Sequence, residues 1–205
     1  KTHDWREGTY KNYFWMVPHN LSTLIDTIGG KEFAEKRLDS LFTRLDADYH
    51  QDWFAAGNEP DFQVPWIYNW VEKEQKTNDI ISRIIDEMYS SEEDGLPGND
   101  DLGTMGAWYV FASLGLYPLI PGVGGFSTNM PQFVESKIIL GNGNILSISK
   151  DDANGKFLNK MELNKVPLES SWVSWSKIKL GGEMKFFTSN SISKNNFTKE
   201  PPSFK

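Results

Sequence analysis

The sequence predicts an α+β fold, with helices in the first part of the chain and antiparallel strands in the second. Apolar residues recur at helical spacing up to about residue 120, whereas runs between residues 132 and 190 alternate as strands do. A glycine-rich segment, PGVGGFSTNMP, lies between these two regions. We therefore expect two domains, a helical one at residues 1–122 and a β segment with a polar tail at residues 123–205.

Composition excludes several classes of function. The net charge is −7 and no basic cluster interrupts it, which argues against nucleic acid as a partner. The absence of cysteine excludes disulfides, thiol nucleophiles and cysteine-bound zinc, but leaves the compartment open. No apolar run is long enough for a membrane span, and the first residues, KTHDWREG, are not a signal peptide but read as mid-domain sequence.

About five helices are predicted in the first region. They are expected at 20–28, at 31–45, from Pro60 onward, at 77–89, and across 100–115. Pro65 should kink or end the third of these helices. Paired helices with loops bearing tryptophan and acids recur at intervals of roughly 40 residues, which favours part of a helical toroid over a compact bundle.

Strand signals dominate the second region. Residues 136–150 predict a hairpin around Gly-Asn-Gly-Asn, and 157–168 and 181–189 predict further strands. We expect these strands to form one antiparallel sheet of a sandwich, with the partner sheet coming from elsewhere. The tail at 193–205 is polar and is expected to fray.

Three acidic loops lie beside aromatic residues. They are Trp5-Arg6-Glu7-Gly8, Gly57-Asn58-Glu59-Pro60-Asp61 and Gly98-Asn99-Asp100-Asp101. Aromatic faces stack on sugar rings while carboxylates and amides bind their hydroxyls, and glycoside hydrolysis requires two carboxylic groups. The alternative, that these acids are helix caps and surface ion pairs, stays open on this pattern alone.

The order of the loops identifies a family. The stretches REGTYKNYFWMVPHN, AAGNEPDFQVPWIYNW and DGLPGNDDLGTMGAWYVFASLGLYPLIPG resemble the family 92 glycoside hydrolases, which are calcium-dependent exo-acting α-mannosidases. The resemblance implies a two-domain enzyme, an N-terminal β-sandwich followed by an (α/α)6 toroid, with the active site between them. This chain would be the C-terminal part, with part of the toroid followed by an antiparallel β-sandwich segment.

The resemblance also implies roles for individual residues. Glu7 corresponds to the general acid, and Asp100 and Asp101 hold the general base, with Asp101 favoured. Asn58 and Glu59 correspond to contacts of the substrate or of Ca²⁺. Further candidates for the substrate pocket are Trp15, His19, Gln63 and Asn99. His19 has an equally good alternative as a residue with a hydrogen bond in the core.

The implied reaction is inverting hydrolysis of terminal mannose from a glycan, with Ca²⁺ held near the sugar's cis hydroxyls. Ala55-Ala56-Gly57 stands where some members carry polar residues, which leaves the linkage preference open. Expected partners are a mannose-containing glycan and the N-terminal remainder of the enzyme, in a secreted, periplasmic or cell-surface location. The alternatives are another inverting (α/α)6 hydrolase acting on a glucan, and a noncatalytic carbohydrate-binding fragment.

Overall fold

The computed structural model describes residues 5–191 and 197–204, and it divides the chain into two compact units. The first unit extends to Val110 and also includes Ser203. The second unit is Phe111–Pro202. The division falls inside a helix, α5 (Thr104–Leu114), rather than in the glycine-rich segment that follows it.

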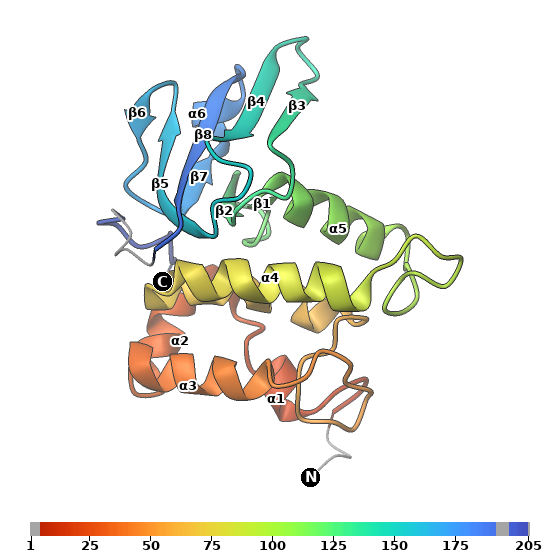
Figure 1. The fold of residues 1–205 in the computed structure, drawn as a ribbon. Helices are drawn as coiled ribbons and strands as arrows, with labels where there is room; N and C mark the ends of the chain where they lie inside the picture. The colour runs from red at the N-terminus through yellow and green to blue at the C-terminus, as the bar shows by residue number, and fades with distance from the viewer. Residues whose placement is uncertain (1–4, 192–196, 205) are drawn as a thin grey trace. The chain divides into compact units, whose positions relative to one another are not determined.

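Helices make up the first unit (Figure 1). Before α5 they are α1 (Tyr10–Tyr13), η2 (Pro18–Asn20), α2 (Leu21–Thr27), α3 (Lys31–Leu41), η3 (Glu59–Asp61), η4 (Val64–Val71) and α4 (Glu74–Met88), where η marks a 3-10 helix. The helices predicted at 20–28 and 77–89 are confirmed within three residues at each end. The helix predicted at 31–45 ends earlier, at Leu41, and its cap residue Phe42 donates its backbone N–H to the Leu38 carbonyl.

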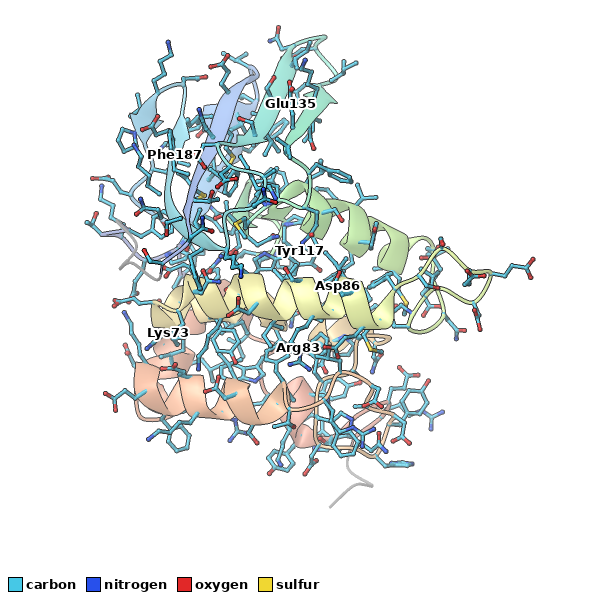
Figure 2. The ribbon with its side chains drawn as sticks, in the orientation of Figure 1. Lys73, Arg83, Asp86, Tyr117, Glu135 and Phe187 are labelled. Carbon is cyan, nitrogen blue, oxygen red and sulfur yellow. The ribbon has the colours of Figure 1, made fainter. Side chains whose placement is uncertain are left out.

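The core of the first unit is built around η4. All eight of its residues are buried, and it packs against both α3 and α4. Pro65 lies in the first turn of η4, where a missing N–H costs no helical hydrogen bond. The expectation that Pro65 kinks or ends the helix begun at Pro60 is wrong, because that helix, η3, already ends at Asp61. From α4, Arg83 reaches toward the end of α3 and donates to the Phe42 carbonyl oxygen at 3.1 Å (Figure 2).

The last described residues, 203 and 204, are held by hydrogen bonds, contrary to the expectation that the tail frays. The Ser203 hydroxyl accepts hydrogen bonds from the Ser22 backbone N–H at 3.0 Å and from the Trp70 indole at 3.2 Å. The Phe204 N–H donates to the His19 carbonyl oxygen at 2.7 Å. Fraying was wrong for 203–204 because the partners are supplied by distant helices, whereas residues 192–196 lie outside the described part of the chain.

Strands make up most of the second unit. They are β1 (Leu116–Tyr117), β2 (Gly125–Thr128), β3 (Glu135–Ile139), β4 (Ile145–Lys150), β5 (Phe157–Leu163), β6 (Val166–Pro167), β7 (Trp172–Ser174) and β8 (Gly182–Ser189), with one short helix, α6 (Trp175–Ile178). One sheet has the order β1-β2-β7 and the other β3-β4-β8-β5-β6. All neighbouring strands are antiparallel except β4 and β8, which are parallel. The predicted α+β class and the hairpin at 136–150 are confirmed, and β1, β2 and β7 were not predicted.

The core of the second unit consists of apolar side chains that alternate with more exposed ones along the strands. Leu146 and Ile148 of β4, Met161 of β5, and Met184 and Phe186 of β8 are almost completely buried. On β8, Phe187 points to the other face, where the ammonium groups of Lys160 and Lys185 lie 4.2 and 5.1 Å from its ring centroid (Figure 2). Across the described residues of both units, no helix has the length and hydropathy needed to cross a bilayer.

This alternation predicts unequal costs for two truncations in the large sheet. Met184→Ala removes a side chain with no exposed surface and leaves a cavity, so we expect a loss of about 2–5 kcal/mol in the free energy of unfolding. The control Ile139→Ala, on a strand residue that is 76% exposed, should cost less than about 1 kcal/mol. Urea unfolding of the two variants gives both values, and equal losses would contradict the assignment of this core.

Candidate active site

The structure brings the three acidic loops together within the first unit. The Asn58 side-chain amide donates to the Glu7 carbonyl oxygen at 2.5 Å, which joins the first loop to the second. The second and third loops are in backbone contact at Gly57 and Gly98. A β-carbon on Gly57 would lie 2.4 Å from the Pro97 carbonyl oxygen, and one on Gly98 would lie 2.7 Å from the Gly57 carbonyl oxygen. No other residue type fits such a backbone contact without displacing a loop.

Two residues of these loops have left-handed backbone conformations, which residues other than glycine rarely adopt. The φ angle is +62° at Glu7 and +38° at Asp101, and the left-handed stretch continues through Leu102 and Gly103. Such a conformation costs on the order of 1–3 kcal/mol per non-glycine residue and persists only where the surroundings enforce it. Strain of this kind is concentrated at functional sites, and here it occurs at the predicted acid and at the favoured base.

The two adjacent aspartates have different contacts. The Asp100 carboxylate accepts a hydrogen bond from the Gly106 N–H at 3.0 Å, and its carbonyl oxygen accepts one from the Thr104 N–H at 2.7 Å. Asp100 therefore caps the start of α5, as its position before an apolar helix predicted. Within the described part of the chain, the Asp101 carboxylate is exposed and makes no hydrogen bond or ion pair. Of the pair, Asp101 is the one whose oxygens remain available.

The second loop turns through η3. Pro60 lies in its first turn, as predicted, and the Gln63 amide donates to the Pro60 carbonyl oxygen at 2.9 Å, so that this side chain closes the turn. One carboxylate oxygen of Glu59, Oε1, is buried and has no hydrogen-bond partner among residues 5–191 and 197–204. A hard, anionic oxygen with no donor is what Ca²⁺ takes as a ligand, so Glu59 fits the implied cation. Residues 5–191 and 197–204 contain no group of three or more His, Asp or Glu side chains that would hold a metal by themselves.

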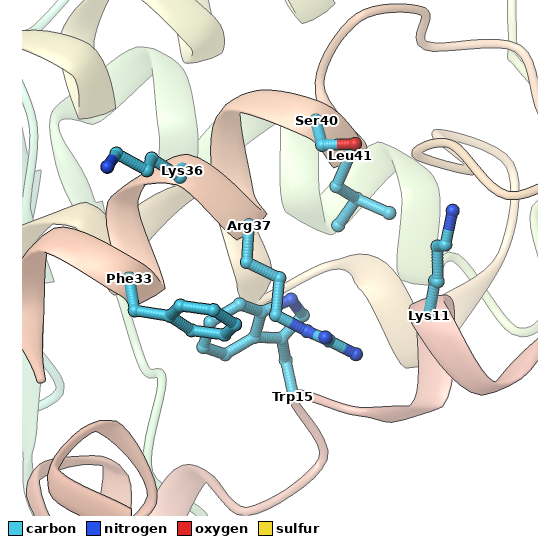
Figure 3. A pocket seen from close by; sticks show the side chains of 7 residues that line it. All are labelled: Lys11, Trp15, Phe33, Lys36, Arg37, Ser40 and Leu41. Carbon is cyan, nitrogen blue, oxygen red and sulfur yellow. The ribbon is translucent and has the colours of Figure 1, made fainter. Parts of the chain in front are cut away.

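The structure does not place Trp15 and His19 at the junction of the three loops. Trp15 is buried and lines a different cavity of about 260 Å³, together with Phe33 and Arg37 of α3 (Figure 3). His19 is exposed in η2. Asn99 is exposed in the turn that leads into Asp100. The roles expected for these three residues stay predictions.

The sequence reasoning did not single out Asn12 or treat Asp61 as a separate candidate, yet both are buried beside the junction. Burial raises the pKa of the Asp61 carboxyl to about 6, although hydrogen bonds from the Ala55 N–H and the Asn12 amide act in the opposite direction. Polar residues in short helices, such as Asn12 in α1 and Asp61 in η3, are normally expected at the surface. No local signal distinguishes a buried asparagine from an exposed one, because the distinction depends on residues about 40 to 50 positions away in sequence.

Comparison with known proteins decides the family. The model of the glycosyl hydrolase family 92 catalytic domain matches residues 1–190. The chain belongs to glycosyl hydrolase family 92. A family 92 α-mannosidase of Bacteroides thetaiotaomicron, solved with mannoimidazole, is 28% identical with a TM-score of 0.85, over 96% of this chain and 28% of that one. The predicted family and the predicted α+β fold class are thereby confirmed.

Two further relatives show how much of a family 92 protein this chain represents. A family 92 inverting mannosidase of Bacteroides thetaiotaomicron shares the fold with a TM-score of 0.81 at 24% identity, over 97% of this chain and 30% of that one. A protein of Arthroderma benhamiae described as an uncharacterized secreted glycosidase is 33% identical over 132 residues, which are 64% of this chain and 16% of the relative. The chain therefore spans less than a third of the length of each of these three relatives.

The different contacts of the two aspartates predict different effects on stability. Asp100→Ala removes the cap of α5 and should lower the free energy of unfolding by about 1 kcal/mol. Asp101→Asn keeps a side chain that tolerates a left-handed backbone and should change this energy by less than about 0.5 kcal/mol. Thermal and urea unfolding measure both, with the exposed Asp94→Ala as a matched control. A larger loss for Asp101→Asn than for Asp100→Ala would reverse the assignment.

Proposed function

We propose that this chain forms the C-terminal part of an exo-acting α-mannosidase that removes terminal α-linked mannose from glycans with inversion. The observation that carries the proposal is the junction of the Glu7, Asn58-Glu59 and Asp100-Asp101 loops inside a family 92 domain. The similarity to an α-mannosidase solved with mannoimidazole supports mannose as the sugar. The N-terminal remainder of the enzyme supplies the rest of the pocket, and the relative described as secreted supports a location outside the cytoplasm.

In this mechanism, Glu7 and Asp101 divide the proton transfers. Glu7, protonated, donates its proton to the glycosidic oxygen as the bond to the leaving group breaks. Asp101, ionised, accepts a proton from the water that attacks the opposite face of the sugar. Its carboxylate is suited to this role because no donor from the described residues occupies it. Inversion requires a separation of roughly 6.5–9.5 Å between the two carboxyl groups, which leaves room for that water.

Asn58 and Glu59 are the residues of this chain that would hold Ca²⁺. Glu59 offers its unpartnered Oε1, and Asn58 uses its amide nitrogen for Glu7, which leaves its carbonyl oxygen for a cation. When bound, the ion would bind the cis O2 and O3 hydroxyls of mannose and favour distortion of the ring. Because Asn58 also contacts the Glu7 backbone, the side chain that binds the ion is tied to the loop that carries the acid.

The acid and base roles predict large losses of activity with little loss of fold. In the full-length protein, Glu7→Gln and Asp101→Asn should each reduce mannose release from α-mannosides by about 10²–10⁴-fold, because each removes one proton transfer. Glu32→Gln, on an exposed position of α3, serves as the control.

Three results would contradict this proposal. They are undiminished turnover by both variants, release of glucose but not of mannose from matched aryl glycosides, and mannose binding without turnover that Glu7→Gln leaves unchanged.

The calcium assignment predicts a loss that added metal reverses. EDTA should abolish mannose release by the full-length protein, and excess Ca²⁺ should restore it. Glu59→Gln replaces the charged ligand and should weaken Ca²⁺ binding, measured by calorimetry, by at least about 10-fold. Unchanged Ca²⁺ affinity in this variant would remove Glu59 from the ligand set.

A further inference from the structure

Asn12 and Asp61 form a buried polar pair close to the loop that carries Glu7. Asp61 has no exposed surface and Asn12 is 1% exposed. The Asn12 amide donates to Asp61 Oδ2 at 3.0 Å, and the same oxygen accepts a hydrogen bond from the Ala55 N–H at 2.9 Å. The other oxygen, Oδ1, is buried and has no hydrogen-bond partner in the part of the chain that the structure describes. We call this pair, Asn12 with Asp61, the Asn12–Asp61 clamp.

Asn12 connects Asp61 to the loop that carries Glu7. Its Oδ1 accepts from the Thr9 N–H at 2.9 Å and from the Thr9 hydroxyl at 3.0 Å. The bond from the Thr9 N–H is one half of the capping box of α1, whose other half joins the Thr9 side chain to the Asn12 backbone N–H. The Asn12 side-chain amide also donates to the Trp53 carbonyl oxygen at 2.8 Å. The side chain therefore has no freedom to rotate without losing several buried hydrogen bonds. Thr9, which it holds, lies two residues after Glu7 in the chain.

The turn that contains Asp61 also contacts Glu7 directly. Asn58, three residues before Asp61, donates to the Glu7 carbonyl oxygen. The 55–61 segment thus holds the loop that carries Glu7 directly, through Asn58 at the Glu7 carbonyl oxygen, and indirectly, through Asp61 and Asn12 at Thr9. Two attachment points so close together explain how Glu7 keeps its left-handed backbone.

We propose that Asp61 acts through Asn12 as a positioning residue for the proton donor Glu7, an inference that rests on the proposed function. A buried carboxylate with one unpartnered oxygen is an expensive way to hold two segments together if stability is all that is required. It is suited to holding them at one distance, because Oδ2 accepts hydrogen bonds from both segments and the buried carboxylate cannot turn away without leaving these donors unpaired. Misplacement of a catalytic group by about 1 Å can cost on the order of 10²-fold in rate.

The leaving group of the substrate provides the test. Hydrolysis of an alkyl α-mannoside or a mannobiose needs a proton donor, whereas dinitrophenyl α-mannoside has a leaving group stable enough to depart without one. In the full-length protein, Asp61→Ala should lower kcat/KM for mannobiose by about 10–100-fold and for the dinitrophenyl substrate by less than about 3-fold. Asp61→Asn keeps an oxygen that accepts both hydrogen bonds, so it should retain most of the activity on both substrates.

A matched control and a second route to the clamp complete the design. Glu87→Ala breaks the exposed Arg83–Glu87 ion pair of α4, which shares no residue with the clamp, and should leave both rates within about 2-fold. Asn12→Leu has a similar shape but neither donates to Asp61 nor accepts from Thr9, so it should reproduce the selective loss if Asp61→Ala does not fold. Equal losses on both substrates for the folded variants would overturn the proposal.

Hydrogen exchange separates failure of this inference from failure of the proposed function. Asp61→Ala should speed amide exchange at Gly8, Thr9 and Tyr13, and Asp61→Asn should not. Unchanged exchange in Asp61→Ala would show that the clamp does not hold the loop, and it would overturn the inference whatever the enzyme does. If the wild type hydrolyses no α-mannoside, the proposed function fails and the role assigned to Glu7 fails with it, even where exchange shows that the clamp is real.

Discussion

The candidate site depends on a contact between two backbones at Gly57 and Gly98. With 2.4 Å between a hypothetical β-carbon of Gly57 and the Pro97 carbonyl oxygen, even an alanine would push the loops apart. The contact places the turn that contains Asn58 and Glu59 directly beside the turn that contains Asp100 and Asp101. The loop of Glu7 joins this contact through the hydrogen bond from the Asn58 amide to the Glu7 carbonyl oxygen.

The acids at this junction are distinguished by their contacts rather than by their chemical type. Asp100 is committed to the start of α5, and Asp61 to a buried hydrogen-bond pair. Glu59 is partly buried with an oxygen that lacks a partner, whereas Asp101 is exposed and unbonded in the described structure. A single type of side chain thereby serves as cap, clamp, candidate metal ligand and candidate base, because burial and neighbouring donors set what each carboxylate can do.

Backbone strain supports the same division. Left-handed conformations at Glu7 and Asp101 cost free energy that a merely structural loop would avoid by using glycine. The β unit shows the contrast. Its cores and registers follow from ordinary alternation, and its left-handed pair Asn164 and Lys165 lies in the tight turn between β5 and β6, where a hairpin requires such angles.

By itself the sequence determined the class of fold, most helix positions, the large hairpin and the family, because each rests on local periodicity, turn residues or a continuous motif. It also placed Glu7, Glu59 and the aspartate pair in loops. Only the tertiary structure decided which aspartate is free, that β4 and β8 run parallel, and that Asn12 meets Asp61 across 49 positions of the chain. These depend on long-range pairing of buried polar groups, whose partners no local pattern of residues specifies.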